Sequence, residues 1–172
     1  VATHRRGPSL FEVGQVASEE LLTVAESGNT APLTDALLAT GKVADIKTTA
    51  GLLSPGQTVT VVVNGGKGIK HISIAAMLLP TNDAFFSLNA VRLPGSSKTS
   101  SYYSPAYDAG SETNDELCIN IPGPHCGGIG LSPDDSGEGY VHIHAGIHGI
   151  GSLDASTYDW RNPVAKIRIR RL

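Results

Sequence analysis

The sequence predicts an all-β protein, a mostly antiparallel β-sandwich with two short helices near its N-terminus. Three observations support this class. Hydrophobic residues make up 40% and charged residues 17% of the chain, which is too apolar for a disordered protein. The 20 Gly and 10 Pro residues suit many turns. After Gly41, short β-branched runs follow one another without helices between them. A length of 172 residues fits a single domain spanning 1–172.

Local capping residues place the two helices. Ser18 is a suitable N-cap for a short helix over 20–25 that ends near Gly28. Pro32 favours the start of a second helix, with Leu33, Leu37 and Leu38 on one side, and Gly41 ends it.

The strands are predicted from β-branched and alternating patterns. We expect strands over 43–49, 58–63, 70–79, 85–93, 140–145 and 164–170, and a long loop over 96–136. Asn64-Gly65-Gly66 after the second run indicates a hairpin. In the last strand Ala165, Ile167 and Ile169 alternate with basic residues, which indicates a half-buried strand with a solvated outer face rather than a phosphate-binding patch.

Charge and cysteine content favour a protein that works outside the cytoplasm. A net charge of −3 argues against a nucleic-acid partner, and no apolar run is long enough to form a transmembrane segment. The chain begins at Val1 without an initiator Met, as a processed secreted or periplasmic protein would. Cys118 and Cys126 are close enough in sequence to form a disulfide that braces a short loop. The alternative is two free thiols in a cytosolic protein.

Two acidic loops form the main candidate site. Asp83 follows an apolar strand directly, and Asp108 and Glu112 flank Gly110, which permits a tight turn between them. Carboxylates from separate loops meet at one end of a sandwich, and such an oxygen cage suits Ca²⁺ better than Mg²⁺. The alternative is that these acids are solvated or cap turns. A further acidic pair, Asp134-Asp135, is expected to be exposed.

Several stretches, in order, carry a family resemblance. They are 73–86 (SIAAMLLPTNDAFF), 107–112 (YDAGSE) and 159–165 (DWRNPVA), with shorter matches at 11–12, 53–56, 121–124 and 140–144. Together they resemble the spondin N-terminal domain of the F-spondin type, in the version found as a stand-alone bacterial protein.

The resemblance implies a C2-like sandwich, an extracellular matrix-associated or adhesive role, and a structural calcium site. Carried over by position, the metal ligands are Asp83, Asp108 and Glu112. Animal domains have Trp where this chain has Ala84, and Asp where it has Glu112. The longer glutamate still ligates, within a looser cage. The implied partners are the calcium ion and an unidentified extracellular protein or polysaccharide.

A histidine-rich strand supports an alternative function. His142 and His144 are predicted to share one strand face with Tyr140, while Val141, Ile143 and Ala145 face the core, and His148 follows a bend. Such imidazoles chelate Zn²⁺ or copper, but the sequence fixes no fourth ligand, so we favour a polar outer strand face whose histidines bond to neighbouring loops. No hydrolase, phosphate-loop or dinucleotide motif is present, so we expect no enzyme. A hydrolase with a site assembled from scattered residues is the weakest alternative.

Overall fold

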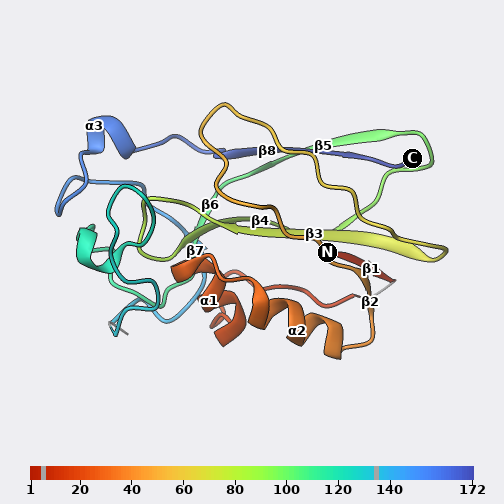
Figure 1. Ribbon diagram of the computed structural model, residues 1–172, viewed down its shortest axis with the longest axis horizontal. Helices are drawn as coiled ribbons and strands as arrows, with labels where there is room; N and C mark the ends of the chain where they lie inside the picture. The colour runs from red at the N-terminus through yellow and green to blue at the C-terminus, as the bar shows by residue number, and fades with distance from the viewer. Residues whose placement is uncertain (5–6, 134–135) are drawn as a thin grey trace.

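The computed structural model describes residues 1–4, 7–133 and 136–172, so the predicted exposure of Asp134 and Asp135 lies outside the described residues. Its strands form two antiparallel sheets (Figure 1). The larger sheet has the order β2 (Val43–Asp45), β1 (Ala2–His4), β3 (Ile69–Met77), β4 (Ala84–Arg92), β6 (Ala106–Asp108) and β7 (His142–Ile143). The smaller sheet pairs β5 (Thr99–Ser104) with β8 (Ala165–Arg170).

Both predicted N-terminal helices are confirmed. In α1 (Glu19–Ser27) the Ser18 hydroxyl accepts a bond from the Leu21 amide at 3.3 Å, and Gly28 ends the helix in the left-handed conformation. In α2 (Ala31–Ala39) Pro32 occupies the first turn. The two helices lie on one side of the six-stranded sheet, and the β5–β8 ribbon lies on the other (Figure 1).

The main core lies between α1 and the central strands. Leu21 and Ala25 of α1 pack with Phe85 of β4 and with Val141, all of them buried. Phe11 adds an aromatic contact to this cluster, because its ring lies 5.3 Å from Phe85 and at 89° to it. Burial of these side chains fixes the height of α1 over β4, and therefore over the loop that precedes β4.

The central strands and the last strand agree with the sequence pattern. The predicted strands 70–79 and 85–93 correspond to β3 and β4, which are the longest strands and pair with each other. The predicted strand 164–170 corresponds to β8, where the Ile169 side chain is buried and its basic neighbours are exposed. The alternation in that strand therefore predicted both the strand and its orientation.

The predicted loop over 96–136 is wrong in its first part. It contains β5, β6 and the 3-10 turn η1 (Cys118–Asn120). Strand β5 has the sequence TSSYYS, which lacks the apolar alternation of a half-buried strand. Its pairing partner is β8, more than sixty residues later, so the strand forms through a non-local contact. The short strand β1 and the helix α3 (Ala155–Tyr158) also lie outside the sequence prediction.

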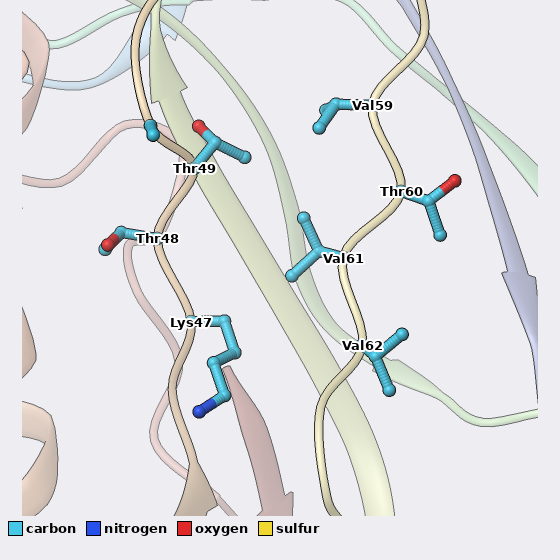
Figure 2. Close-up of a pocket in the computed structure, with 8 residues that line it drawn as sticks. Lys47, Thr48, Thr49, Val59, Thr60, Val61 and Val62 are labelled. Atoms are coloured by element: carbon cyan, nitrogen blue, oxygen red, sulfur yellow. The ribbon is translucent and has the colours of Figure 1, made fainter.

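The predicted strand over 58–63 and its hairpin at Asn64 are also wrong. Segments 47–50 and 59–62 run beside one another, but a cavity of about 300 Å³ separates them (Figure 2). The Asn64 amide instead donates to the Asp45 carboxylate at 2.6 Å. β-branched residues favour extended backbone, but a strand also needs a partner for its peptide groups. The predicted strand 43–49 likewise shortens to β2.

The loops between β6 and β8 gather at one end of the molecule, together with η1 and α3 (Figure 1). Cys118 and Cys126 form a disulfide there, with a Cα–Cα distance of 4.7 Å. A second buried cluster of Ile121, Ile147 and Leu153 supports these loops. Within the described part of the chain, no helix is long and apolar enough to cross a membrane.

Candidate metal centre at the loop-rich end

Strand register brings the first acidic residues together. Ala84 of β4 lies opposite Asp108 of β6, and Asp108 in turn lies opposite His142 of β7. Asp83, immediately before β4, accepts a bond from the Ala109 amide through its carbonyl at 3.3 Å. Residues that are far apart in sequence therefore meet in one row across three strands.

Asp83 is fully buried and organises the loop that follows β6. Its Oδ2 accepts hydrogen bonds from the Ser111 amide at 2.8 Å, the Ser111 hydroxyl at 3.1 Å and the Glu112 amide at 3.2 Å. Its Oδ1 is buried and has no hydrogen-bond partner among the described residues. A buried carboxylate oxygen without a partner raises the free energy of the folded state, because it has lost its hydrogen bonds to water and has formed none with the protein.

Gly110 makes the turn that the sequence predicted between Asp108 and Glu112. Its φ is +74°, and a Cβ there would lie 2.4 Å from the carbonyl oxygen of Tyr140, so only glycine fits. The Gly110 amide donates to Asp108 Oδ1 at 2.8 Å, and the Asn114 amide nitrogen donates to Asp108 Oδ2 at 2.7 Å. Both oxygens of the buried Asp108 thus have a donor.

Glu112 is buried on the other side of this turn. Its Oε1 accepts hydrogen bonds from the amide and the hydroxyl of Ser132. Its Oε2 is buried without a hydrogen-bond partner among the described residues. Glu26 of α1 is also buried, and its electrostatic interactions with the Ser111 side chain and with Asp83 link the helix to the same group of acids.

The four buried acids have raised pKa values. Burial raises the pKa of Asp108 to about 7, and the nearby Asp83 raises it further. Burial also raises the pKa of Glu112 to about 7, with Glu26 and Asp83 contributing. The pKa values of Asp83 and Glu26 are raised too, again mainly by burial. Asp83 raises the pKa of each of the other three by repulsion, so the four groups form one electrostatic cluster.

Within the described residues, no Lys or Arg forms an ion pair with this acidic cluster. The partners within 4.0 Å are imidazoles: His142 Nδ1 lies 3.9 Å from Asp108 Oδ1, and His144 Nε2 lies 3.8 Å from Asp108 Oδ2. His142 also contacts Glu138 at 3.6 Å. The cluster therefore carries more negative charge than its protein neighbours neutralise.

One set of three ligand atoms in this region is already compact. Oxygens of Asp108 and Glu138 and a ring nitrogen of His142 all lie within 4.8 Å of one another. Asp83 and Glu112 are not in such a set within the described part of the chain, although each has an unpartnered buried oxygen. A divalent cation fits this donor chemistry, because it would partner those oxygens and neutralise the excess charge.

The second three-ligand set is not a metal site. It comprises Cys118, His125 and Cys126, but the two sulfurs are bonded to each other and offer no thiolate. His125 instead contacts the Tyr158 hydroxyl through its Nδ1 at 2.7 Å.

The predicted orientation of the histidine strand is wrong in part. His144 is buried and Ile143 is 49% exposed, the reverse of the expectation, although Val141 is buried as predicted. Strand β7 extends only over His142 and Ile143, but the His144 amide still bonds in register to Ala106 of β6, whereas the Val141 amide bonds to Gln15 outside the sheet. From His142 to Ala145 the two-residue alternation continues, but the histidines are on the more buried side, and Ile143 and Ala145 are exposed.

His144 has a structural role in this arrangement. Its Nδ1 accepts from the Gly146 amide at 3.0 Å, which places the proton on Nε2, and Nε2 contacts Asn114 Oδ1 at 3.0 Å. Burial lowers the pKa of His144 to about 4, so the ring is neutral. Because both nitrogens are engaged and His148 is exposed, His142, His144 and His148 do not form a three-ligand set among the described residues.

Glu116 fixes the neighbouring loop. This buried carboxylate accepts hydrogen bonds from three consecutive amides: His148 at 2.5 Å, Gly149 at 2.8 Å and Ile150 at 3.0 Å. We expect Glu116→Gln to lower the free energy of unfolding by about 2–3 kcal/mol, since its amide nitrogen would face peptide donors. Chemical denaturation measures this. The exposed acid Asp35, changed to Asn, is the control and should cost under about 0.5 kcal/mol; an equal loss in both would contradict the assigned role.

The sequence analysis did not predict that Glu26 and Glu138 belong to the acidic cluster. For Glu26, the helical spacing could have indicated a buried position. Glu26 lies four residues after Leu22, which packs against the core, so the helical period places it on a buried side. Glu138 lies in a Gly-rich loop with no periodic pattern, and only the folded chain places it near Asp108.

A comparison with protein families identifies the chain. The sequence model of the Spondin_N family matches residues 1–113, about two thirds of the chain. The chain belongs to the Spondin_N family. The match includes Asp83, Asp108 and Glu112, whereas the similar stretches at 121–124, 140–144 and 159–165 lie beyond it. Spondin_N domains are generally non-catalytic binding modules. No curated protein matches the chain.

Proposed function

We propose that this Spondin_N protein is a secreted or periplasmic binding module whose loop-rich end is ordered by a structural calcium ion. Asp83, Asp108 and Glu112 supply carboxylate ligands, and Glu138 lies beside Asp108, where it can complete the shell. The ion neutralises the cluster and ties the loop after β6 to the start of β4. The ordered surface then binds an extracellular protein or polysaccharide in an adhesive or matrix role.

One observation carries this proposal. Four buried carboxylates lie in one cluster without a Lys or Arg partner among the described residues, and two of them have an unpartnered oxygen. Folding leaves such a cluster protonated or bound to a cation. Oxygen donors of this kind are the ligands that Ca²⁺ selects. The family membership, the disulfide and the resemblance of the motifs support an extracellular location.

The direct test is metal binding by protein purified without an affinity tag. We expect one calcium per chain by elemental analysis after dialysis against calcium buffer, and a heat signal on titration of the chelated protein. Glu112→Gln and Asp83→Asn should each weaken calcium binding at least tenfold, whereas the exposed Glu12→Gln should not change it. Absence of binding in the folded wild-type protein would overturn the proposal.

Calcium affinity should also depend steeply on pH. Asp108 and Glu112 each hold a proton up to a pKa of about 7 in the metal-free protein, and calcium must displace those protons. We expect affinity at pH 8 to be at least about tenfold higher than at pH 6, measured by calorimetry in two buffers of different ionisation heat. A pH-independent affinity would show that these carboxylates do not bind the ion.

A second candidate is a transition-metal site, and it rests on the compact set of Asp108, Glu138 and His142. An imidazole with two carboxylates suits Zn²⁺ better than Ca²⁺. This site uses His142 in place of the His142, His144 and His148 cluster that the sequence suggested. His142→Gln separates the candidates: it should abolish stoichiometric zinc if zinc is the native metal, and change calcium affinity less than threefold otherwise.

The sandwich arrangement belongs to this proposal as well. The β5–β8 ribbon and the extended segments 47–50 and 59–62 would together form the second layer of a C2-like sandwich, over one domain spanning 1–172. Hydrogen exchange tests it: amides of Val59, Val61 and Val62 should be protected in the folded protein if the layer is complete. Fast exchange at all three would reject a complete second sheet.

A further inference from the structure

The positive charges of this protein are concentrated in segments that contain no acid. Residues 46–82, 84–107 and 160–172 hold ten of the 13 Lys and Arg residues and none of the 16 Asp and Glu residues. These segments include the whole of β3, β4, β5 and β8. Although the net charge is only −3, positive charge is therefore concentrated on the sheets and negative charge in the acidic loops.

The outer face of the β5–β8 ribbon carries a row of cations. Register places Arg170 opposite Thr99, Arg168 opposite Ser101 and Lys166 opposite Tyr103, and residues directly opposite share a face. All six side chains are exposed. The cations repeat every second residue, so their stems are spaced by roughly 7 Å along β8. The alternating sequence of β8 indicated only a solvated face. The pairing of β8 with β5 places a hydroxyl-bearing side chain of β5 beside each cation.

A small cavity lined by further cations lies at the end of the ribbon, where Arg171 directly follows Arg170. The cavity has a volume of about 190 Å³, and its lining includes Lys70, Arg92 and Arg171. Backbone bonds hold its walls, because the Ser97 amide bonds to the Arg171 carbonyl at 3.1 Å and the Leu93 amide to the Lys70 carbonyl at 2.8 Å. Neither these three cations nor those of the β8 row form an ion pair with any described residue.

The geometry points to an acidic polysaccharide as the ligand of this surface. We define the basic ribbon as Lys166, Arg168 and Arg170 with the cavity cations Lys70, Arg92 and Arg171. A linear polymer with carboxylate or sulfate groups would place its anions along the cations and its hydroxyls against Thr99 and Ser101. The inference names a partner class for the binding module proposed above, on residues separate from the acidic cluster.

Two other polyanions fit this surface less well. Single-stranded nucleic acid is bound by stacking on free aromatic rings, but Tyr103 lies under Lys166 at 5.7 Å and is the one aromatic on this face. A lipid surface is bound by basic residues together with apolar side chains that insert. The outward positions of β8 from Lys166 to Arg170 carry no apolar side chain, because Ile167 and Ile169 face inward.

A binding assay with defined polymers tests the inference. Dextran sulfate and polygalacturonate represent sulfated and carboxylated polymers, neutral dextran is the control polymer, and all measurements contain EDTA. We expect the full chain to bind at least one acidic polymer, with affinity falling as salt is raised from 50 to 300 mM. Because calcium is absent, failure of the calcium proposal leaves this test intact.

Matched variants locate the surface. Arg168→Gln with Arg170→Gln should weaken polymer binding at least tenfold at unchanged melting temperature. Lys42→Gln with Arg161→Gln removes the same charge elsewhere on the exposed surface and should weaken binding less than twofold. The inference is overturned by no binding to either acidic polymer, by equal losses in both variants, or by tighter binding to a single-stranded DNA oligonucleotide or to phosphatidylserine vesicles.

Discussion

Replacing Glu112 by Gln is expected to stabilise the calcium-free protein at pH 8 while removing most of its stabilisation by calcium. The wild-type glutamate has a pKa of about 7 because of burial and of repulsion from Glu26 and Asp83. The Glu112 carboxyl therefore holds its proton more tightly in the folded protein than in the unfolded chain. That contribution to stability is complete below the unfolded pKa near 4 and is lost as pH rises through about 7.

Gln keeps the shape of the side chain and removes the charge. Its oxygen can still accept the bonds from the Ser132 amide and hydroxyl. Each pKa unit corresponds to about 1.4 kcal/mol, so we expect a gain of about 1–3 kcal/mol at pH 8 without metal. The melting temperature should rise by about 3–8 °C for a chain of this size. At pH 5 the gain should be smaller, because the wild-type carboxyl is then protonated.

Calcium should reverse the order of the two proteins. A ligand at a hundred times its Kd stabilises the native state by about 2.7 kcal/mol, and the wild type alone should receive this in full. Differential scanning calorimetry with EDTA and with calcium measures both effects. Glu12→Gln, on an exposed side chain, is the control and should behave as wild type in both buffers. A variant that melts lower than wild type under both conditions would show that Glu112 is only a structural partner of Ser132.

Local features of the fold were predictable because they depend on neighbouring residues. Ser18 and Gly28 mark the ends of α1 through interactions within one turn of helix. The alternation around Ile167 and Ile169 specifies β8 in the same way. Strand β5 forms by pairing with β8, and the segment over 58–63 pairs with no strand among the described residues, so neither outcome could be inferred from composition.

The candidate site likewise combines features that the sequence shows with features that only the folded chain brings together. Asp83 follows an apolar strand and Gly110 requires a left-handed turn, and both features are visible in the sequence. Glu26 and Glu138 join the cluster from a helix and from a distant loop, so the excess of buried charge emerges only in three dimensions. The burial of His144 was predicted wrongly for a related reason, because its ring contacts Asn114, Asp108 and Trp160, which come from distant segments of the chain. The sequence thus indicated three of the carboxylates that meet in this cluster, and the fold added Glu26 and Glu138 to them.

The largest loss of stability is expected from Phe85→Ala, which removes a side chain of the main core that lies beside the proposed metal centre. Phe85 is fully buried in β4, two residues after Asp83. Its ring packs at 5.3 Å from Phe11 and stacks at 5.6 Å on Tyr107, which directly precedes Asp108. Truncation of a buried phenylalanine costs about 3–5 kcal/mol, because transfer free energy is lost and a cavity remains.

That cost is a large part of the 5–15 kcal/mol that stabilises a typical domain, so the variant should melt about 10–15 °C lower. The neighbouring Phe86→Ala is the matched control, since Phe86 is only half-buried and points to the opposite side of the strand. Calcium should recover part of the loss in Phe85→Ala, because the ion holds the start of β4 against the loop after β6. Equal losses in the two variants would place the main core elsewhere. A failure of calcium to stabilise Phe85→Ala, with wild type responding normally, would instead show that the ring itself is required to position Asp83.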